Sequence, residues 1–241
     1  MSDFFRAREM RAPLLTAIGT MLVLGVVASS EARAADVSGN ATLTSDYVWR
    51  GVSQTMGDPA VQAGARVAGT NGLYGSVWGS NVEFAPETHA SSEFDFTLGW
   101  SGKISDHWAL DANVLHYAYP STTTDLDWTE LNGTLTYADK LWFSLGWSPE
   151  ALGSDEQGTY ALVGGRWPVN GRFRFEANLA HYFLDDVYGE SYSHGNVSAI
   201  WTVKAPFELR VTAHATDGNA KDLFGDNVAG SRIEAALQAS F

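Results

Sequence analysis

From residue 37 onward, apolar and polar side chains alternate along the chain in separate stretches. In one of them Phe94 and Phe96 alternate with Glu93 and Asp95. A period of two places successive side chains on opposite faces of a β-strand. The pattern predicts twelve strands, at 37–53, 59–69, 72–84, 92–102, 107–118, 128–138, 141–148, 158–167, 172–184, 192–203, 207–216 and 229–241. The facing of 72–84, 158–167 and 192–203 is ambiguous, because a bulge would shift the alternation.

The connectors between these stretches alternate in length. Every second connector is short, namely TNG, GKISD, ADK, PVNG and KAP. The others are longer and acidic, apart from the brief QTMGD after the first stretch. An even number of antiparallel strands, with short turns at one end and longer loops at the other, is typical of an outer-membrane barrel. The sequence therefore predicts an all-β fold, a transmembrane antiparallel up-and-down β-barrel of 12 strands.

Aromatic residues gather near the ends of the apolar faces. We expect one belt at the short turns, made of Trp100, Trp108, Tyr137, Phe173, Phe207 and Phe241, and one at the longer loops, made of Tyr47, Trp49, Phe94, Trp147 and Phe183. Such belts lie at membrane–water interfaces. A soluble β-sandwich also alternates, but its outer face would be plain solvated surface. Phe241 also matches the terminal aromatic residue that the bacterial barrel-assembly machinery recognises, so this machinery is an expected partner.

The first 34 residues have the features of an export signal. Arg6, Arg8 and Arg11 precede the apolar run LLTAIGTMLVLGVVA, and the small-residue motif ARA follows at 32–34. This order predicts a secretory signal peptide that is cleaved before Ala35. An uncleaved anchor is the alternative, although the apolar run is short for a spanning helix. We therefore divide the chain into a signal peptide, 1–34, and an outer-membrane barrel, 35–241.

Composition narrows the range of partners. The chain has 24 glycines, nine tryptophans and no cysteine, which excludes a disulfide-stapled scaffold. Its formal net charge is −13, and the part after residue 34 carries −14, because residues 1–34 hold four arginines against three acidic residues. This acidity argues against a nucleic-acid partner and against docking on an anionic lipid surface by charge alone.

The start of the predicted barrel resembles a known family. The stretch SGNATLTSDYVWRGVSQT, followed by DPAVQAG and GLYGSVWGSNVEF, resembles the TorF-type porins, a family catalogued as conserved hypothetical proteins. The similarity is specific across 38–84, through Ser45-Asp46-Tyr47, Arg50-Gly51, Ser53-Gln54 and Trp78-Gly79-Ser80-Asn81, and looser but colinear beyond. It implies a bacterial outer-membrane porin. The family supplies no established substrate or catalytic residue.

Inward-facing positions of the predicted barrel carry both signs of charge. The candidate pore-lining residues are Asp46, Arg50, Arg66, Glu93, Asp95, Asp111, Arg172, Arg174, Glu176, Glu208, Arg210, Arg232 and Glu234. Twelve strands close to a backbone diameter of roughly 24 Å, and side chains narrow it further. On a strand, Asp46 and Arg50 lie about 13 Å apart, so each needs a different partner. The charges either pair and partly close the bore, or set up a field that screens solutes, and the sequence leaves both open.

The longer connectors are acidic, with twelve Asp and Glu residues against Lys221 alone. A negative mouth attracts cations over about 8 Å at physiological salt. Divalent ions could also bridge these carboxylates to lipopolysaccharide phosphates, although acidity for solubility alone is the simpler interpretation. The stretch DGNAKDLFGD lacks the spacing of an EF-hand loop, so we expect neither a metal nor a cofactor.

Together these patterns favour a porin-like channel for passive diffusion of small, cationic or neutral solutes in the bacterial outer membrane. Its expected partners are outer-membrane lipid, lipopolysaccharide and the solutes. One alternative is a closed structural or adhesive barrel. Another is a lipid hydrolase, which needs a serine activated by a histidine and a third group that orients the histidine. The six histidines are scattered, and His181 is expected on the apolar face as an interfacial imidazole.

Overall fold

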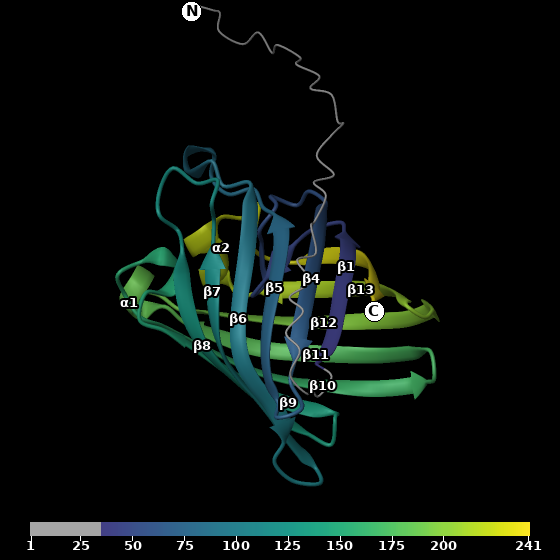
Figure 1. Ribbon diagram of the computed structural model, residues 1–241. Coiled ribbons are helices and arrows are strands. Elements are labelled where there is room, and N and C mark those ends of the chain that lie inside the picture. Colours follow the sequence, from purple (N-terminus) through teal and green to yellow (C-terminus); the bar gives the residue numbers. More distant parts are fainter. Residues whose placement is uncertain (1–34) are drawn as a thin grey trace, which may run out of the picture. The chain divides into compact units, whose positions relative to one another are not determined.

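Residues 35–241, the part of the chain that the computed structural model describes, form a closed barrel of twelve antiparallel strands (Figure 1). The expected signal peptide at 1–34 lies outside the described residues. The barrel strands are β1 (Asp36–Thr44), β4 (Ala60–Ala68), β5 (Leu73–Asn81), β6 (Ser92–Lys103), β7 (Trp108–Ala118), β8 (Trp128–Tyr137), β9 (Leu141–Ser148), β10 (Gly158–Asn170), β11 (Phe173–Phe183), β12 (Tyr192–Lys204), β13 (Phe207–Thr216) and β14 (Arg232–Ser240). The predicted strand number and topology are confirmed.

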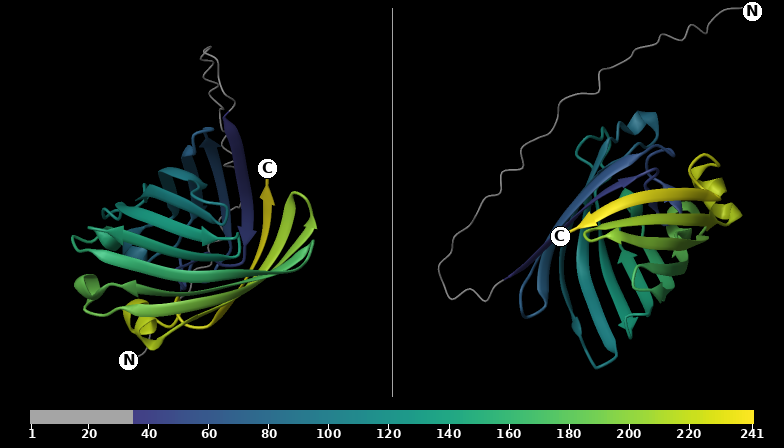
Figure 2. Two further views of the ribbon diagram at one scale, coloured as in Figure 1. Left: turned by 90° about the horizontal axis from the view of Figure 1, so that it is seen from below. Right: turned by 90° about the vertical axis from the view of Figure 1, so that its right-hand side faces the viewer.

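The last strand closes the barrel against the first. Figure 2 shows β14 in yellow beside β1 in purple, and their register pairs Leu43 with Leu237. Gly39 and Phe241 exchange two backbone hydrogen bonds, of 2.6 and 3.0 Å. Every other barrel strand pairs with its neighbours along the chain. The ladder is therefore continuous around the barrel and leaves no free strand edge.

Side chains alternate between the interior and the exterior of the barrel, as the period of two predicts. In β6, the outward side chains Phe96 and Leu98 are 51% and 73% exposed, whereas Glu93, on the opposite face of the same strand, is 2% exposed. An apolar surface that runs around the whole barrel would be a liability in water and is suited to lipid. No helix among residues 35–241 is long and apolar enough to cross a membrane.

Aromatic side chains mark both ends of the outer surface. Trp108, Tyr137 and Phe207 are exposed near the short turns, and Trp147 and Phe183 are exposed near the longer connectors. These positions agree with the two predicted belts. Two other members of the predicted belts, Tyr47 and Trp49, lie elsewhere and are described below.

The two ends of the barrel differ in their connectors, as predicted. One end, the short-turn end, has connectors at 69–72, 104–107, 138–140, 171–172 and 205–206. The long-loop end carries the short helices η1 (Pro86–Thr88), η2 (Ala151–Gly153), α1 (Asp185–Tyr188) and α2 (Gly218–Phe224). Asp217 caps α2 by accepting a hydrogen bond from the Ala220 backbone N–H.

The first predicted strand, 37–53, is too long. Strand β1 ends at Thr44, and residues 45–59, the inserted segment, turn away from the wall. Within it, β2 (Val48–Trp49) and β3 (Val52–Ser53) form a small separate hairpin. Arg50 and Gly51 at its turn have φ angles of 46° and 84°, and positive φ at both central positions is what a two-residue type I′ hairpin requires. The brief connector predicted at QTMGD is therefore the end of a longer segment.

The strands of ambiguous facing turn aromatic residues inward. Tyr74 in β5, Tyr160 in β10 and Tyr192 in β12 are buried, whereas Val163 in β10 is exposed outside. Apolar and aromatic residues thus occupy both faces of these strands. Alternation of polarity alone could not assign their facing, because the interior is itself partly aromatic.

Candidate functional site

The inserted segment crosses the barrel interior at the long-loop end. The Ser53 backbone N–H donates to the Val228 carbonyl at 2.9 Å, and the Glu83 N–H donates to the Gln54 carbonyl at 2.8 Å. These contacts tie the segment to the two connectors that flank β1 and β4, one after β5 and one before β14. The segment therefore fills part of the mouth instead of extending the wall.

Arg50 holds the segment against the opposite wall. Its Nη2 lies 2.6 and 2.8 Å from the two carboxylate oxygens of Glu130 in β8, and the side chains are only 7% and 2% exposed. The rings of Trp49, Tyr160 and Tyr182 lie 4.3, 4.0 and 4.5 Å from the guanidinium carbon. Burial works to lower the pKa of Arg50, but the Glu130 carboxylate outweighs it and the pKa is raised above its usual value. The pair is thus a buried ion pair within an aromatic cage.

Asp46 anchors the other side of the segment. Its carboxylate accepts hydrogen bonds from the Ser53 hydroxyl at 2.5 Å, from Thr55 at 3.2 Å and from the Arg232 guanidinium at 2.7 Å. Arg232 belongs to β14, so this ion pair joins the segment to the closing strand. Asp46 and Arg50 thus have separate partners, although the residues between them do not form the continuous strand on which that expectation rested.

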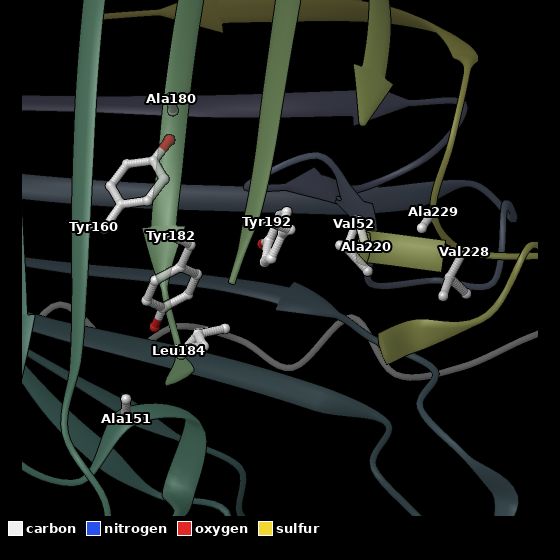
Figure 3. Packing of buried hydrophobic residues seen from close by; sticks show 10 residues of the cluster. All are labelled: Val52, Ala151, Tyr160, Ala180, Tyr182, Leu184, Tyr192, Ala220, Val228 and Ala229. Atoms are coloured by element: carbon white, nitrogen blue, oxygen red, sulfur yellow. The ribbon is translucent and has the colours of Figure 1, made fainter. Parts of the chain in front are cut away.

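Trp49 lies inside the barrel at the long-loop end. Its ring meets Tyr117 at 5.9 Å, Trp128 at 6.1 Å and Tyr182 at 6.2 Å between centroids, each edge-on. Figure 3 shows the adjoining cluster, in which Val52 of the segment packs among buried residues of the wall and of the long connectors. The predicted place of Trp49 in the outer belt is therefore wrong.

Tyr47 also points inward. Its hydroxyl donates to the Glu93 carboxylate at 2.9 Å, and its ring contacts Trp78 at 5.4 Å. Burial raises the pKa of Tyr47 and the Glu93 charge adds to this, so the hydroxyl remains a donor. The belt prediction fails for Tyr47 because the chain leaves the wall after Thr44, although the polar–apolar alternation continues.

A ladder of charges follows the interior at the short-turn end. Glu176 accepts from Arg166 at 2.7 Å and from Arg174 at 3.1 Å, and Arg174 also pairs with Glu208 at 2.7 Å. The Arg174 and Glu208 side chains are 28% and 30% exposed, against 2% for Glu130. Solvent therefore reaches the charges of the short-turn half, whereas the long-loop half is filled.

A second network lies at the seam of the barrel. Glu234 in β14 contacts Arg210 at 3.1 Å, His214 at 3.0 Å and the Thr44 hydroxyl at 3.0 Å. These residues come from β1, β13 and β14. The network therefore braces the closing strand pair in addition to its backbone ladder.

The other predicted positions on the barrel wall also face inward, and two of them, Arg66 and Asp111, contact the same residue, Tyr74. Arg66 lies over the Tyr74 ring at 3.4 Å, and Asp111 accepts from the Tyr74 hydroxyl and from Asn113, each at 2.8 Å. Glu93 and Asp95 lie two residues apart in β6. These four charged residues are thus spread along β4, β6 and β7.

Arg172 does not lie on the inward face of a strand. It occupies the exposed turn between β10 and β11, and not the start of a strand. The Asn170 side chain accepts hydrogen bonds from the backbone N–H groups of Arg172 and Phe173, at 2.9 and 3.0 Å, which fixes the turn.

Two charged residues of the interior were not predicted. Glu130 shares the inward face of β8 with Asn132 and Thr134, so its facing follows from the alternation of that strand. Arg166 lies on β10, whose facing was ambiguous. The signal for Glu130 was present in the sequence, but nothing local indicated that its partner would be Arg50.

A histidine–serine contact lies on the outer surface, away from this interior. His181 Nδ1 is 2.8 Å from the Ser193 hydroxyl, and the ring of His181 contacts the ring of Phe183 in an edge-to-face arrangement. The carboxylate of Asp217 accepts a hydrogen bond from the Ser193 backbone N–H and caps α2. Asp217 thus does not orient His181. Within residues 35–241, no group of three or more His, Asp or Glu side chains is arranged to hold a metal ion.

Comparisons with known proteins agree with this architecture. A family model described as "Bacterial protein of unknown function (Gcw_chp)" matches residues 28–182, more than half of the chain. A comparison with curated proteins finds no match.

The chain resembles solved structures of porins and of an outer membrane channel. The KdgM porin in complex with disordered oligogalacturonate has 8% identity and a TM-score of 0.54, over 85% of this chain and 98% of that one. The NanC porin has 11% identity and a TM-score of 0.51, over 86% and 99%. An outer membrane channel from Pseudomonas putida F1 has 12% identity and a TM-score of 0.51, over 86% and 94%. Identities this low establish a shared barrel fold and nothing finer.

Proposed function

Because the chain belongs to the Gcw_chp family of bacterial proteins, whose description assigns no function, we propose a function from the barrel itself: a porin-like channel of the bacterial outer membrane. It would pass small cationic or neutral solutes by passive diffusion. The narrower resemblance to TorF-type porins agrees with this proposal and stays a prediction.

The observation that carries the proposal is the contrast between the two faces of the barrel. The outer face is apolar and ends in aromatic residues, whereas the inner face carries charges that solvent reaches at the short-turn end, such as Arg174 and Glu208. A barrel that only needed a stable core would not keep solvated charges inside, because apolar packing is at least as stabilising as ion pairs. A hydrated, charged interior supports solute passage.

The long-loop end supports a preference for cations. Exposed carboxylates such as Asp125, Asp186 and Asp222 lie in its connectors, and Lys221 is itself paired with Asp226 at 3.2 Å. With the usual orientation of such barrels, these connectors face the cell exterior. Their negative potential would concentrate cations and repel anions at the mouth.

The inserted segment would set the width of the channel. Arg50, Glu130 and Trp49 fill the long-loop half, while the short-turn half is solvated. We therefore expect a small unitary conductance that depends on the position of residues 45–59.

A closed structural barrel is the second candidate. The observation that favours it is the burial of the Arg50–Glu130 pair, whose side chains are almost completely shielded from solvent. Conduction distinguishes the two candidates, because a structural barrel carries no current.

Several further expectations belong to the same proposal. A signal peptide at 1–34 would direct export and be cleaved, and the outward apolar face would contact lipid and lipopolysaccharide. Phe241, 77% exposed on the outer side, would be read by the barrel-assembly machinery.

The test is a planar bilayer into which the purified protein is reconstituted. We expect stepwise currents, and in a salt gradient a reversal potential of the sign that cation preference gives. A bilayer that stays silent over many insertions would favour the structural barrel, and a reversal potential of the opposite sign would contradict the cation preference.

A further inference from the structure

A pocket of about 390 Å³ opens at the long-loop end, above the inserted segment. Trp49 of the segment, Trp128 of β8 and Tyr192 of β12 form its floor and wall. A volume of this size matches a small organic ligand. Nothing in the proposed channel function requires such a pocket.

Aromatic rings from the connectors complete the lining. Phe84 and Tyr119 contact each other at 5.5 Å, and Phe224 contacts both Tyr188 and Tyr192, at 5.8 and 5.5 Å. The rings come from four different connectors and from strand β12, and all of them line the same pocket. The faces of aromatic rings carry negative potential and attract cations.

The charged groups at the pocket point the same way. Glu83 is the only charged side chain that lines it, and no lysine, arginine or histidine of the described residues does. Glu83 is exposed, and Asp125, which is also exposed, is the chain neighbour of the lining residue Leu126. An anionic ligand would therefore meet repulsion here, whereas a cation would not.

Trp49, one ring of the pocket lining, already contacts a cation of the barrel. The guanidinium carbon of Arg50 lies within 4.5 Å of the centroids of Trp49, Tyr160 and Tyr182. Its charge is balanced by Glu130, so it does not oppose a second cation at full strength. Trp49 belongs both to this cage and to the pocket lining.

From these observations we propose that the mouth pocket binds a small organic cation whose charge is an alkylated ammonium. The aromatic rings enclose the alkyl groups and stabilise the charge, and Glu83 supplies the opposite charge at the rim. The proposal adds a solute class to the proposed channel function. It rests on that function only in one respect, namely that the bound cation then passes through the barrel.

Binding to the protein in non-ionic detergent micelles tests the proposal by isothermal titration. The probes share one shape: choline is cationic, 3,3-dimethylbutan-1-ol is neutral and 3,3-dimethylbutanoate is anionic. We expect choline to bind about tenfold more tightly than the neutral alcohol, and the anion to bind weakest. Titration into empty micelles corrects for partition into detergent.

Matched variants locate the site. Glu83→Gln and Tyr188→Leu remove one charge and one ring at the exposed rim and should each lower the advantage of choline over the alcohol at least twofold. Asp155→Asn removes an exposed carboxylate that does not line the pocket and should leave the advantage unchanged. The proposal is overturned if choline does not bind, or if choline and the neutral alcohol bind equally. It is also overturned if Glu83→Gln and Asp155→Asn have equal effects. The titration needs no bilayer, so a failure of conduction is recorded separately.

Discussion

Arg50 combines two unfavourable features, a buried positive charge and a left-handed backbone with φ of 46°. A bulky residue rarely adopts such a backbone, and it persists only where surrounding contacts impose it. Glu130 neutralises the charge, three rings enclose it, and the Tyr192 hydroxyl donates to the Arg50 carbonyl at 3.0 Å. The residue therefore links the hairpin turn to the far wall of the barrel.

Removal of the Glu130 carboxylate should destabilise the fold, because the Arg50 charge depends on it. Glu130→Ala leaves the Arg50 charge buried without a carboxylate, and we expect a loss of about 3–5 kcal/mol in the free energy of unfolding. The measurement is urea unfolding in micelles, followed by tryptophan fluorescence. Glu208→Ala is the control, because its ion pair is partly exposed and water can solvate the Arg174 left behind, so we expect a smaller loss of about 1–2 kcal/mol.

Equal losses in Glu130→Ala and Glu208→Ala would contradict the special role of the buried pair. The double variant Arg50→Met with Glu130→Leu removes both charges, and we expect it to recover much of the lost stability.

At the scale of elements, the hairpin β2–β3 decides what the first stretch of the chain does. Its turn at Arg50 and Gly51 reverses the chain inside the barrel, where a continuous strand would have carried Tyr47 and Trp49 to the rim. The turn is close to the wall, since a Cβ at Gly51 would lie 2.7 Å from the Cβ of His194.

Gly51→Ala should therefore destabilise the inserted segment. The added methyl group both strains a residue with φ of 84° and meets His194, so we expect a loss of about 2–4 kcal/mol by the same unfolding measurement. Gly57→Ala is a matched control, because Gly57 has φ of 87° but open space around it. It should lose about 1 kcal/mol, and equal losses at both glycines would show that the turn is not packed against the wall.

The sequence predicted most of the barrel because each wall strand repeats one local rule. Strands such as β6, β13 and β14 alternate over their full length, and the charged positions Glu208, Arg210 and Glu234 follow directly from that alternation. The rule depends only on neighbouring residues. It therefore needs no knowledge of the rest of the fold.

The same rule fails where a partner distant in the sequence decides the structure. Residues 45–53 alternate like a strand, but the Arg50–Glu130 pair spans 80 positions and the Asp46–Arg232 pair spans 186. Such pairings exist only after closure of the barrel. The inward facing of aromatic residues could not be predicted for the same reason, because Tyr160 and Trp128 pack on the inserted segment and not on lipid.

At the scale of the described barrel, the interior has two unlike halves. At the long-loop end, buried rings and the Arg50–Glu130 pair fill the space, and an aromatic pocket lies above them. At the short-turn end, partly exposed ion pairs line the wall. In the proposed channel, the inserted segment would therefore control passage, because it fills the half of the interior that the wall strands alone would leave open.

Replacement of this segment tests the central claim. Thr44 and Ala60 are direct partners in the β1–β4 register, so a short Gly-Ser turn can replace residues 46–58 without a change in the wall. The control replaces only the exposed residues 56–59 by Gly-Ser residues of equal number and leaves the interior filled.

Single-channel conductance in planar bilayers is the most direct measurement. We expect the replacement of residues 46–58 to give steps at least severalfold larger than those of the unaltered protein, and the control to give unaltered steps. Equal step sizes in all three proteins, or three silent bilayers, would contradict the claim that a conducting barrel is narrowed by its inserted segment.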